Sequence, residues 1–203
     1  MKLIQKSVVF HVGELDISKK RKFSYETGLG ISVSEHPMEW AEIAELSGNV
    51  YKFTAPQGVF LDVYKLTESD MDLITRWGIS NKLIKISSIY YFTYYDSESE
   101  SMMKMEFESK RKATDNAEGE KVRKKIGMVA TQKFHRLIGW KIDQLLVKDY
   151  LIVYFAHAMD IDGVWFNDKL DVANYSAPRG MIFDDKLLRW RIEQVSSISN
   201  LTN

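Results

Sequence analysis

Two short stretches decide the fold of this chain: Val8-Val9-Phe10-His11-Val12-Gly13 and Gly28-Leu29-Gly30-Ile31-Ser32-Val33-Ser34. Each stretch combines apolar, largely β-branched residues with glycine or serine, a pattern that is typical of β-strands. A glycine in or beside an apolar strand allows the backbone to approach another segment or a ligand closely. The two stretches therefore predict two strands whose ends place a histidine, glycines and hydroxyl groups near a common site.

The composition is that of an ordinary globular protein, with 45% hydrophobic and 28% charged residues in a chain of 203. Lys plus Arg and Asp plus Glu balance at 28 each, so no overall field attracts nucleic acid or an anionic membrane. The chain contains no cysteine, which excludes disulfides, thiol catalysis and cysteine-ligated zinc. We see no signal peptide and no apolar run long enough to span a bilayer. We therefore expect a cytoplasmic protein without a membrane partner.

The remaining pattern predicts strands at both ends of the chain and a helical middle, which is an α+β fold. Expected strands lie at residues 6–11, 31–34, 50–55, 59–64, 150–156, 163–166, 180–183 and 187–195. Expected helices run from Pro37 towards Gly48, from Thr67 to about Trp77, and from Glu118 to Leu146. We expect a single domain over residues 1–203, with one mixed sheet from residues 6–64 and 149–195. A helical, charged insertion at about residues 81–148 interrupts this domain.

A further motif near the C-terminus joins the first two stretches in a recognisable order. Asp162-Gly163-Val164-Trp165-Phe166 predicts a strand, a loop follows, and Arg179-Gly180-Met181-Ile182-Phe183 predicts the next strand. Together with the strand before His11-Val12-Gly13 and the Gly-x-Gly strand that leads into a helix, this order resembles the ADP-ribosyltransferase superfamily. The resemblance covers about residues 6–64 and 149–195. It implies a split mixed/antiparallel β-sheet core, NAD as co-substrate, and transfer of ADP-ribose to a macromolecular acceptor.

The resemblance also assigns residues to the binding of NAD. His11 matches the histidine of the subgroup that carries a histidine, a tyrosine and a glutamate, while its tyrosine corresponds to Ser32. The backbone at Val12 or Gly13 is expected to hold the nicotinamide amide. Tyr25, Trp40 or Trp165 is expected to stack on the nicotinamide ring, and Arg179 to contact a phosphate. The complete expected cofactor-binding set is His11, Val12, Gly13, Gly30, Ser32, Ser34, Tyr25, Trp165 and Arg179.

The catalytic acid has no direct match, because the family's glutamate position falls at Arg179-Gly180. Cleavage of the bond between ribose and nicotinamide develops positive charge on the sugar, which a carboxylate stabilises. The loop before Arg179 offers Asp171, Asp168 and Asp162, and Asp171 is preferred because it lies closest in sequence to the following strand. Glu35 and Glu193 are the alternatives.

Other site classes fit the sequence less well. A histidine that ends an apolar strand is more often structural than functional, and the glycines beside His11 bring the two interpretations to about even. Gly28-x-Gly30 lacks the third glycine and the preceding strand of a dinucleotide-binding fingerprint, and it is also explained by a turn. His36, His135 and His157 have no metal-ligand spacing, so we expect no metal. The chain has no Gly-x-Ser-x-Gly and no phosphate-binding loop, which argues against hydrolases and nucleoside triphosphatases.

These observations favour a mono-ADP-ribosyltransferase, either an intracellular toxin, with an antitoxin as a possible partner, or a phage-defence factor. The alternatives are a catalytically inactive NAD-binding module, which the missing glutamate suggests, and an unrelated protein-interaction module.

The insertion is expected to select the acceptor. It combines the aromatic run Tyr90–Tyr95 with the basic groups Lys110-Arg111-Lys112 and Lys121–Lys125, and this pairing favours single-stranded nucleic acid. A protein substrate or an antitoxin could use the same surface. The acidic residues of the insertion argue against a nucleic-acid acceptor; they are Asp96, Glu98, Glu100, Glu106 and Glu108.

Overall fold

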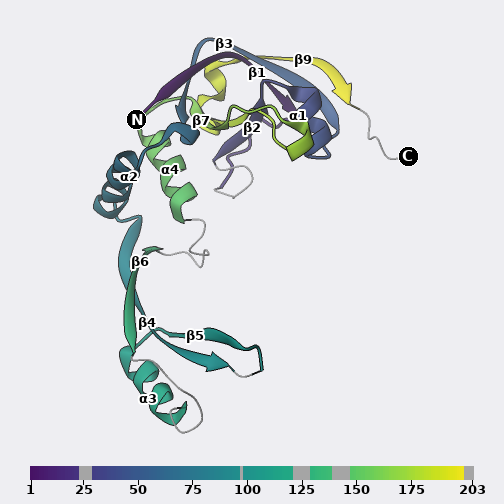
Figure 1. The fold of residues 1–203 in the computed structure, drawn as a ribbon. Coiled ribbons are helices and arrows are strands. Elements are labelled where there is room, and N and C mark those ends of the chain that lie inside the picture. The colour runs from purple at the N-terminus through teal and green to yellow at the C-terminus, as the bar shows by residue number, and fades with distance from the viewer. Residues whose placement is uncertain (23–28, 97, 121–128, 139–146, 199–203) are drawn as a thin grey trace. The chain divides into compact units, whose positions relative to one another are not determined.

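Figure 1 shows the fold in a computed structural model, which describes residues 1–22, 29–96, 98–120, 129–138 and 147–198. The chain divides into two units by its internal contacts. Unit 1 consists of residues 1–80 and 148–203, and unit 2 consists of residues 81–147. The insertion expected at about 81–148 therefore coincides with unit 2, within one residue.

Unit 1 is a mixed sheet with helices, so the expected α+β class is confirmed. Its strands are β1 (Leu3–Val12), β2 (Gly30–Ser34), β3 (Gly48–Asp62), β7 (Gly163–Asn167), β8 (Arg179–Phe183) and β9 (Arg191–Ile198). Its helices are α1 (Pro37–Ile43), α2 (Glu68–Ser80) and α4 (Val147–Ala158), with short 3-10 turns at Val63–Lys65, Val172–Asn174 and Asp184–Arg189.

The sheet order is β1-β2-β8-β7-β3-β9, and β1 also pairs with β3. The β3–β7 pairing is parallel and the others are antiparallel. Between β1 and β2 the register has one residue pair, Phe10 with Ser34. The sheet is therefore split at this point into two half-sheets, β1-β3-β9 and β2-β8-β7. They are joined again where residues 60–62 of β3 pair with β7.

The apolar faces of both half-sheets form one core. Its fully buried members include Val9, Val33, Phe53, Phe60 and Trp165, which come from four different strands. On β2 and β3, Val33 and Phe53 each stand between two polar residues, as the two-residue period of a half-buried strand requires. A second cluster, which includes Trp40 and Ala177, packs α1 against the ends of β1 and β3.

The two strands expected at 50–55 and 59–64 are one strand, β3, so the hairpin turn predicted at Pro56-Gln57-Gly58 is wrong. Here three residues of β3 lie opposite one residue of β1, which is a bulge. The bulge bends β3 where its other edge changes partner, from β9 to β7. Gly58 is needed at the bend, because a Cβ there would lie 2.3 Å from the Trp190 ring.

The strand expected at Tyr150–Ala156 is also wrong, since these residues belong to helix α4. A continuous apolar run is compatible with a buried strand or a buried helix, and periodicity does not separate them. The helix buries Leu151, Ile152, Val153 and Ala156. It lies beside α2 in Figure 1. The rings of Trp77 on α2 and Phe155 on α4 meet edge-to-face, with 5.3 Å between their centroids.

Unit 2 is mainly strand rather than helix, which corrects the expected helical insertion. It contains β4 (Ile84–Asp96), β5 (Ser101–Phe107), α3 (Lys110–Glu120) and β6 (Ala130–Leu137) in a sheet of order β5-β4-β6. The helix expected at 118–146 is wrong at β6, whose residues pair with β4. Residues 121–128 and 139–146, which include the basic run Lys121–Lys125, lie outside the described residues.

Gly180→Ala tests how closely β7 and β8 approach. A Cβ at this position would lie 2.2 Å from the Trp165 ring and 2.7 Å from the Val164 carbonyl oxygen. We expect the substitution to lower the free energy of unfolding by about 1–3 kcal/mol, since buried rings and backbone have little room to move. Urea denaturation measures this, with Leu188→Ala (92% exposed) as the control that changes stability little. Equal stability of the two variants would contradict the packing.

Asp70→Asn tests the start of α2. Thr67 and Asp70 form a capping box, and the Met1 amino group lies 2.8 Å from the Asp70 carboxylate. The hydrogen bond from this amino group, and then those from Thr67, lower the pKa of Asp70 from 3.8 to about 2. The stabilisation is therefore complete above pH 3.8 and is lost as the pH falls towards 2. We expect the substitution to lower the melting temperature at pH 7, and the difference from wild type to shrink between pH 4 and pH 2.

Candidate functional site

His11 lies at the point where the two half-sheets separate. Phe10 is the last residue of β1 that pairs with β2, and beyond it β1 continues beside β3 alone. The His11 side chain crosses this split, because its Nδ1–H donates to the Ser32 carbonyl oxygen on β2 at 2.9 Å. The imidazole thus replaces a missing backbone pairing between the two strands.

The surroundings of His11 favour the neutral imidazole. Burial lowers the pKa of His11 below 6.5; the hydrogen bonds of the ring to the carbonyl oxygens of Ser32 and Glu14 oppose this shift, and the positive charge of Arg21 adds to it. Nε2 lies 3.3 Å from the Glu14 carbonyl oxygen, which can only accept, so the neutral ring can donate to one of the two carbonyl oxygens at a time. Gly13 borders this nitrogen: a Cβ on Gly13 would lie 3.7 Å from Nε2, and its φ of +126° favours glycine.

A cavity of about 670 Å³ lies on the same face of the sheet as His11. Register places His11 opposite Tyr51 and Phe53 opposite Ile192, and such cross-strand pairs share a face. Tyr51 and Phe53 also share a face, since they are two residues apart on β3. Ile192 lines the cavity, and so does Arg21, whose charge acts on His11. His11 itself does not line this cavity, but the shared face and Arg21 connect the two, and we treat them as one candidate site, hereafter the His11 site.

The His11 site combines an apolar lining with a charged rim. The apolar side chains are Leu29, Leu187, Trp190 and Ile192, with the more exposed Ile17 and Leu188. The charged groups form two pairs: Arg21 Nη1 lies 2.6 Å from Asp184 Oδ1, and His157 Nε2 lies 3.2 Å from Asp185 Oδ1. Lys19 and Lys20 add further cations. A concave apolar site of this size with a few polar groups suits a small organic ligand that carries negative charge.

Several expected NAD-binding residues of the two strands have structural partners. Gly30 has no room for a side chain, because a Cβ would lie 1.8 Å from the Ile182 carbonyl oxygen of β8. The buried Ser34 hydroxyl donates to the Pro178 carbonyl oxygen and accepts from the His36 N–H. Val12 is buried and paired with Val50, and the Gly13 N–H donates to the Asn49 carbonyl oxygen. Ser32 contributes its carbonyl oxygen to His11.

The expected aromatic stacking residues are part of the core or lie outside the described chain. Trp165 is fully buried, and Lys6 Nζ lies 4.6 Å from its ring centre. Trp40 is buried in the cluster under α1. Tyr25 lies outside the described residues. Trp190 is the indole that lines the His11 site, and sequence reasoning did not single it out.

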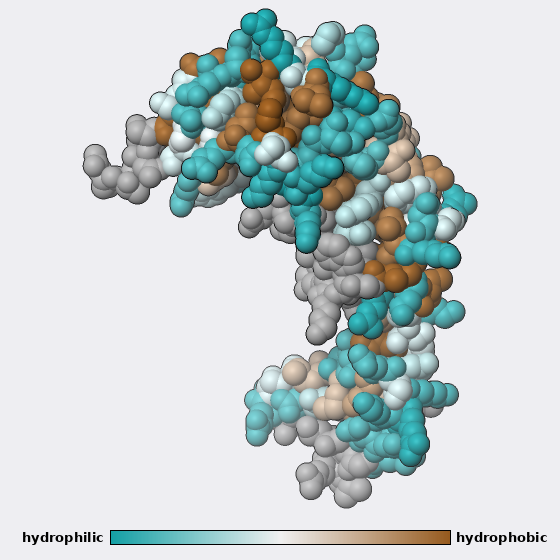
Figure 2. Space-filling model, turned by 180° about the vertical axis from the view of Figure 1, so that it is seen from behind, coloured by the Kyte–Doolittle hydropathy of each residue, from teal (hydrophilic) through white to brown (hydrophobic). Residues whose placement is uncertain are grey.

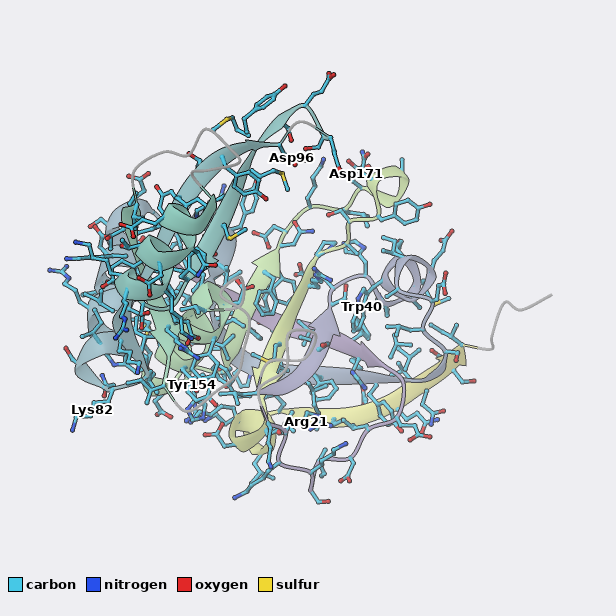
Figure 3. The ribbon with its side chains drawn as sticks, turned by 90° about the horizontal axis from the view of Figure 1, so that it is seen from below. Arg21, Trp40, Lys82, Asp96, Tyr154 and Asp171 are labelled. Carbon is cyan, nitrogen blue, oxygen red and sulfur yellow. The ribbon has the colours of Figure 1, made fainter. Side chains whose placement is uncertain are left out.

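The three expected acids lie in different environments, and none lines the His11 site. Asp171 is on the β7–β8 connection, where Lys169 at 2.7 Å, followed by Asn174, lowers its pKa. Asp168 lies 3.4 Å from Lys6, which also binds Glu35 at 2.8 Å. Asp162 is buried, accepts from the Val59 N–H at 2.8 Å, and lines a separate cavity of about 400 Å³. Figure 3 shows Asp171 well apart from Arg21.

Arg179 is exposed at the start of β8, opposite Ser34 and Asn167. The carboxylates that do line the His11 site are Asp184 and Asp185, which follow β8 directly. Their position after Phe183, at the end of a predicted strand, is the signal that could have found them. The contact with Arg21 spans 163 residues of sequence, so no local pattern reveals it.

No protein-family model, curated protein or solved structure matches this chain. Among the described residues, no group of three or more His, Cys, Asp or Glu side chains is arranged to hold a metal ion. No helix within these residues has the length and apolar character needed to cross a membrane.

The lowered pKa of His11 gives a direct test of this geometry. We expect its imidazole to titrate below pH 6.5 in an NMR titration of the ring protons. Because folding disfavours the charged ring, the contribution of His11 to stability is present above pH 6.5 and decreases as the pH falls below it. Arg21→Gln removes a nearby positive charge and should raise the His11 pKa. A His11 pKa at or above 6.5 in the wild type would contradict the partly buried position.

Proposed function

We propose that the protein is a mono-ADP-ribosyltransferase that uses NAD as co-substrate and modifies a macromolecule. The observation that carries the proposal is the partly buried His11, which bridges the split sheet and shares a face with a cavity suited to an anionic organic ligand. This agrees with the split sheet and strand-end histidine that the sequence resemblance implies. The proposal extends to a cytoplasmic toxin or phage-defence factor.

The residues of the His11 site match the chemical groups of the co-substrate. Trp190, Leu187 and Ile192 offer apolar surface for a planar ring, and Arg21 with Lys19 offers cations for phosphates. His11 is held by Nδ1 on the Ser32 carbonyl oxygen, and its Nε2 would reach a ribose hydroxyl by exchanging the Glu14 carbonyl oxygen for it. These residues would bind and orient the co-substrate, which supplies the bond between ribose and nicotinamide that is broken.

A carboxylate is still needed to stabilise the positive charge on the sugar. Asp171, Asp168 and Asp162 remain proposed for this role, and the lining of the His11 site adds Asp184 and Asp185. The Asp184 carboxylate already forms an ion pair with Arg21. It becomes available to the sugar when a phosphate of the ligand takes its place on Arg21.

His11→Ala tests the proposal. We expect nicotinamide release from NAD to fall by the equivalent of about 2–4 kcal/mol in transition-state stabilisation, because the variant loses a preorganised polar group. Chromatography of free nicotinamide measures the rate, and the unfolding free energy is measured in parallel. His36→Ala is the matched control, since this more exposed histidine lies at the N-terminus of α1. Full activity in His11→Ala, or no activity in the wild type, would contradict the proposal.

Asp→Asn substitutions at positions 162, 168, 171, 184 and 185 identify the acid. Each removes the negative charge and keeps the shape of the side chain. We expect one variant to lose nicotinamide release by a factor of about 100 or more, as removal of a charge-stabilising group does, while still binding NAD by calorimetry. Wild-type rates in all five would show that the carboxylate lies elsewhere, with Glu35 and Glu193 next to test.

A catalytically inactive NAD-binding module is the second candidate. The observation in its favour is that Arg179, and no carboxylate, stands at the start of β8. Binding of NAD without release of nicotinamide would select this candidate over the transferase.

A further inference from the structure

One face of the sheet in unit 2 is covered by a helix. The buried ring of Phe92 on β4 packs with Phe107 of β5, and Ala113 and Ala117 of α3 are also buried. Helix α3 contacts both β4 and β5. Register places Tyr90, Phe92 and Tyr94 on this face, together with their partners on β5. The residues between them on β4 therefore belong to the opposite face.

That opposite face carries tyrosines beside cations, and we call it the tyrosine face. Its members follow from the register and are Tyr91, Thr93 and Tyr95 of β4 with Met102, Lys104 and Glu106 of β5. Tyr95 is 47% exposed and Met102 is 65% exposed. Lys104 Nζ lies 4.3 Å from the ring centre of Tyr91, and it contacts Glu106 Oε1 at 2.5 Å and Gln132 at 3.0 Å.

The same face continues along β6 with further residues of this kind. Phe134 lies opposite Ser87, and Arg136 lies opposite Lys85. Aromatic rings therefore lie at three positions of this face, which align with residues 87, 91 and 95 of β4. These positions are four residues apart along the strand, or about 13 Å. Figure 2 shows hydrophobic and hydrophilic side chains interleaved along the surface of this unit.

The balanced charge of the whole chain conceals a difference between its parts. Residues 81–147 hold 13 of the 28 lysines and arginines but 9 of the 28 acidic residues. This third of the chain therefore has an excess of four positive charges, and the remainder an equal negative excess. This excess comes from residues 121–128, outside the described residues, whereas the tyrosine face itself places Lys85, Lys104 and Arg136 among aromatic rings. Cations interleaved with rings are what single-stranded nucleic acid requires, because cations follow the backbone and the bases stack on the rings.

We propose that the tyrosine face of unit 2 binds single-stranded nucleic acid. The bases stack on Tyr95 and Tyr91, and Lys104 with Lys85 and Arg136 contacts phosphates. The role of this nucleic acid as acceptor for ADP-ribose rests on the proposed function. Its binding to the tyrosine face does not involve NAD.

The test measures fluorescence anisotropy of labelled single strands of RNA and DNA, each about 15 nucleotides long, and of a DNA duplex, with the full chain and no NAD. We expect the single strands to bind more tightly than the duplex. Tyr95→Ser should weaken binding about 5- to 100-fold through the loss of one stacking group. Lys104→Gln should weaken binding and reduce the slope of log affinity against log salt by about 0.7.

Tyr64→Ser is the matched control, because Tyr64 in unit 1 is 69% exposed and also lies beside a lysine, Lys65, at 5.1 Å. We expect this variant to bind as the wild type does. Absence of binding, equal affinity for the duplex, or unchanged binding in both Tyr95→Ser and Lys104→Gln would overturn the proposal and leave a protein as the partner of this face. Because nicotinamide release is measured separately, such a failure is distinct from failure of the transferase proposal.

Discussion

Strand β1 belongs to the half-sheet β1-β3-β9, and the register joins it to β2 of the other half-sheet at one residue pair, Phe10 with Ser34. Along most of its length β1 is paired to β3, so the path of β1 follows β3 and not β2. Beyond Phe10 the two strands separate, and the backbone groups that face the gap need other partners. The His11 imidazole supplies one of them through the Ser32 carbonyl oxygen. A polar, titratable ring is thereby held partly buried between the half-sheets, on the face where Trp190 and Ile192 line the cavity.

The glycines of the sequence motifs allow neighbouring strands to pack closely. At Gly30 and Gly163 a Cβ would lie 1.8 Å from a carbonyl oxygen of β8, and at Gly180 it would meet Trp165. The close approach of backbone expected at Gly30 is therefore correct, and at all three positions the neighbour is an adjacent strand. Gly13 differs, because its lack of a side chain leaves space beside His11 Nε2. Gly30, Gly163 and Gly180 thus bring together β2, β8 and β7, the three strands of one half-sheet.

Sequence patterns located β1, β2, β7, β8, α1 and α2, where alternation, glycine and helix-start residues agree. They failed where tertiary contacts decide the local structure. Residues 150–156 are β-branched and aromatic, yet packing against α2 makes them a helix. Pro56-Gln57-Gly58 has the composition of a turn, yet β1 pairs on both sides of it and keeps one strand. His11 could be identified from its place at a strand end, whereas the Arg21–Asp184 pair joins segments 163 residues apart.

Both acids on the rim of the His11 site lie against basic side chains, and Lys19 and Lys20 add further cations. Arg21 is held by the Asp184 carboxylate, and His157 by that of Asp185. A partly buried guanidinium without such a partner would be costly, so Asp184 stabilises Arg21 in place. A phosphate-bearing ligand must therefore exchange with a carboxylate that already occupies the guanidinium, and its net gain is the difference between two ion pairs. Such a site discriminates between ligands by geometry more than by charge, because only an anion that also fills the apolar lining around Trp190 gains more than the carboxylate it displaces.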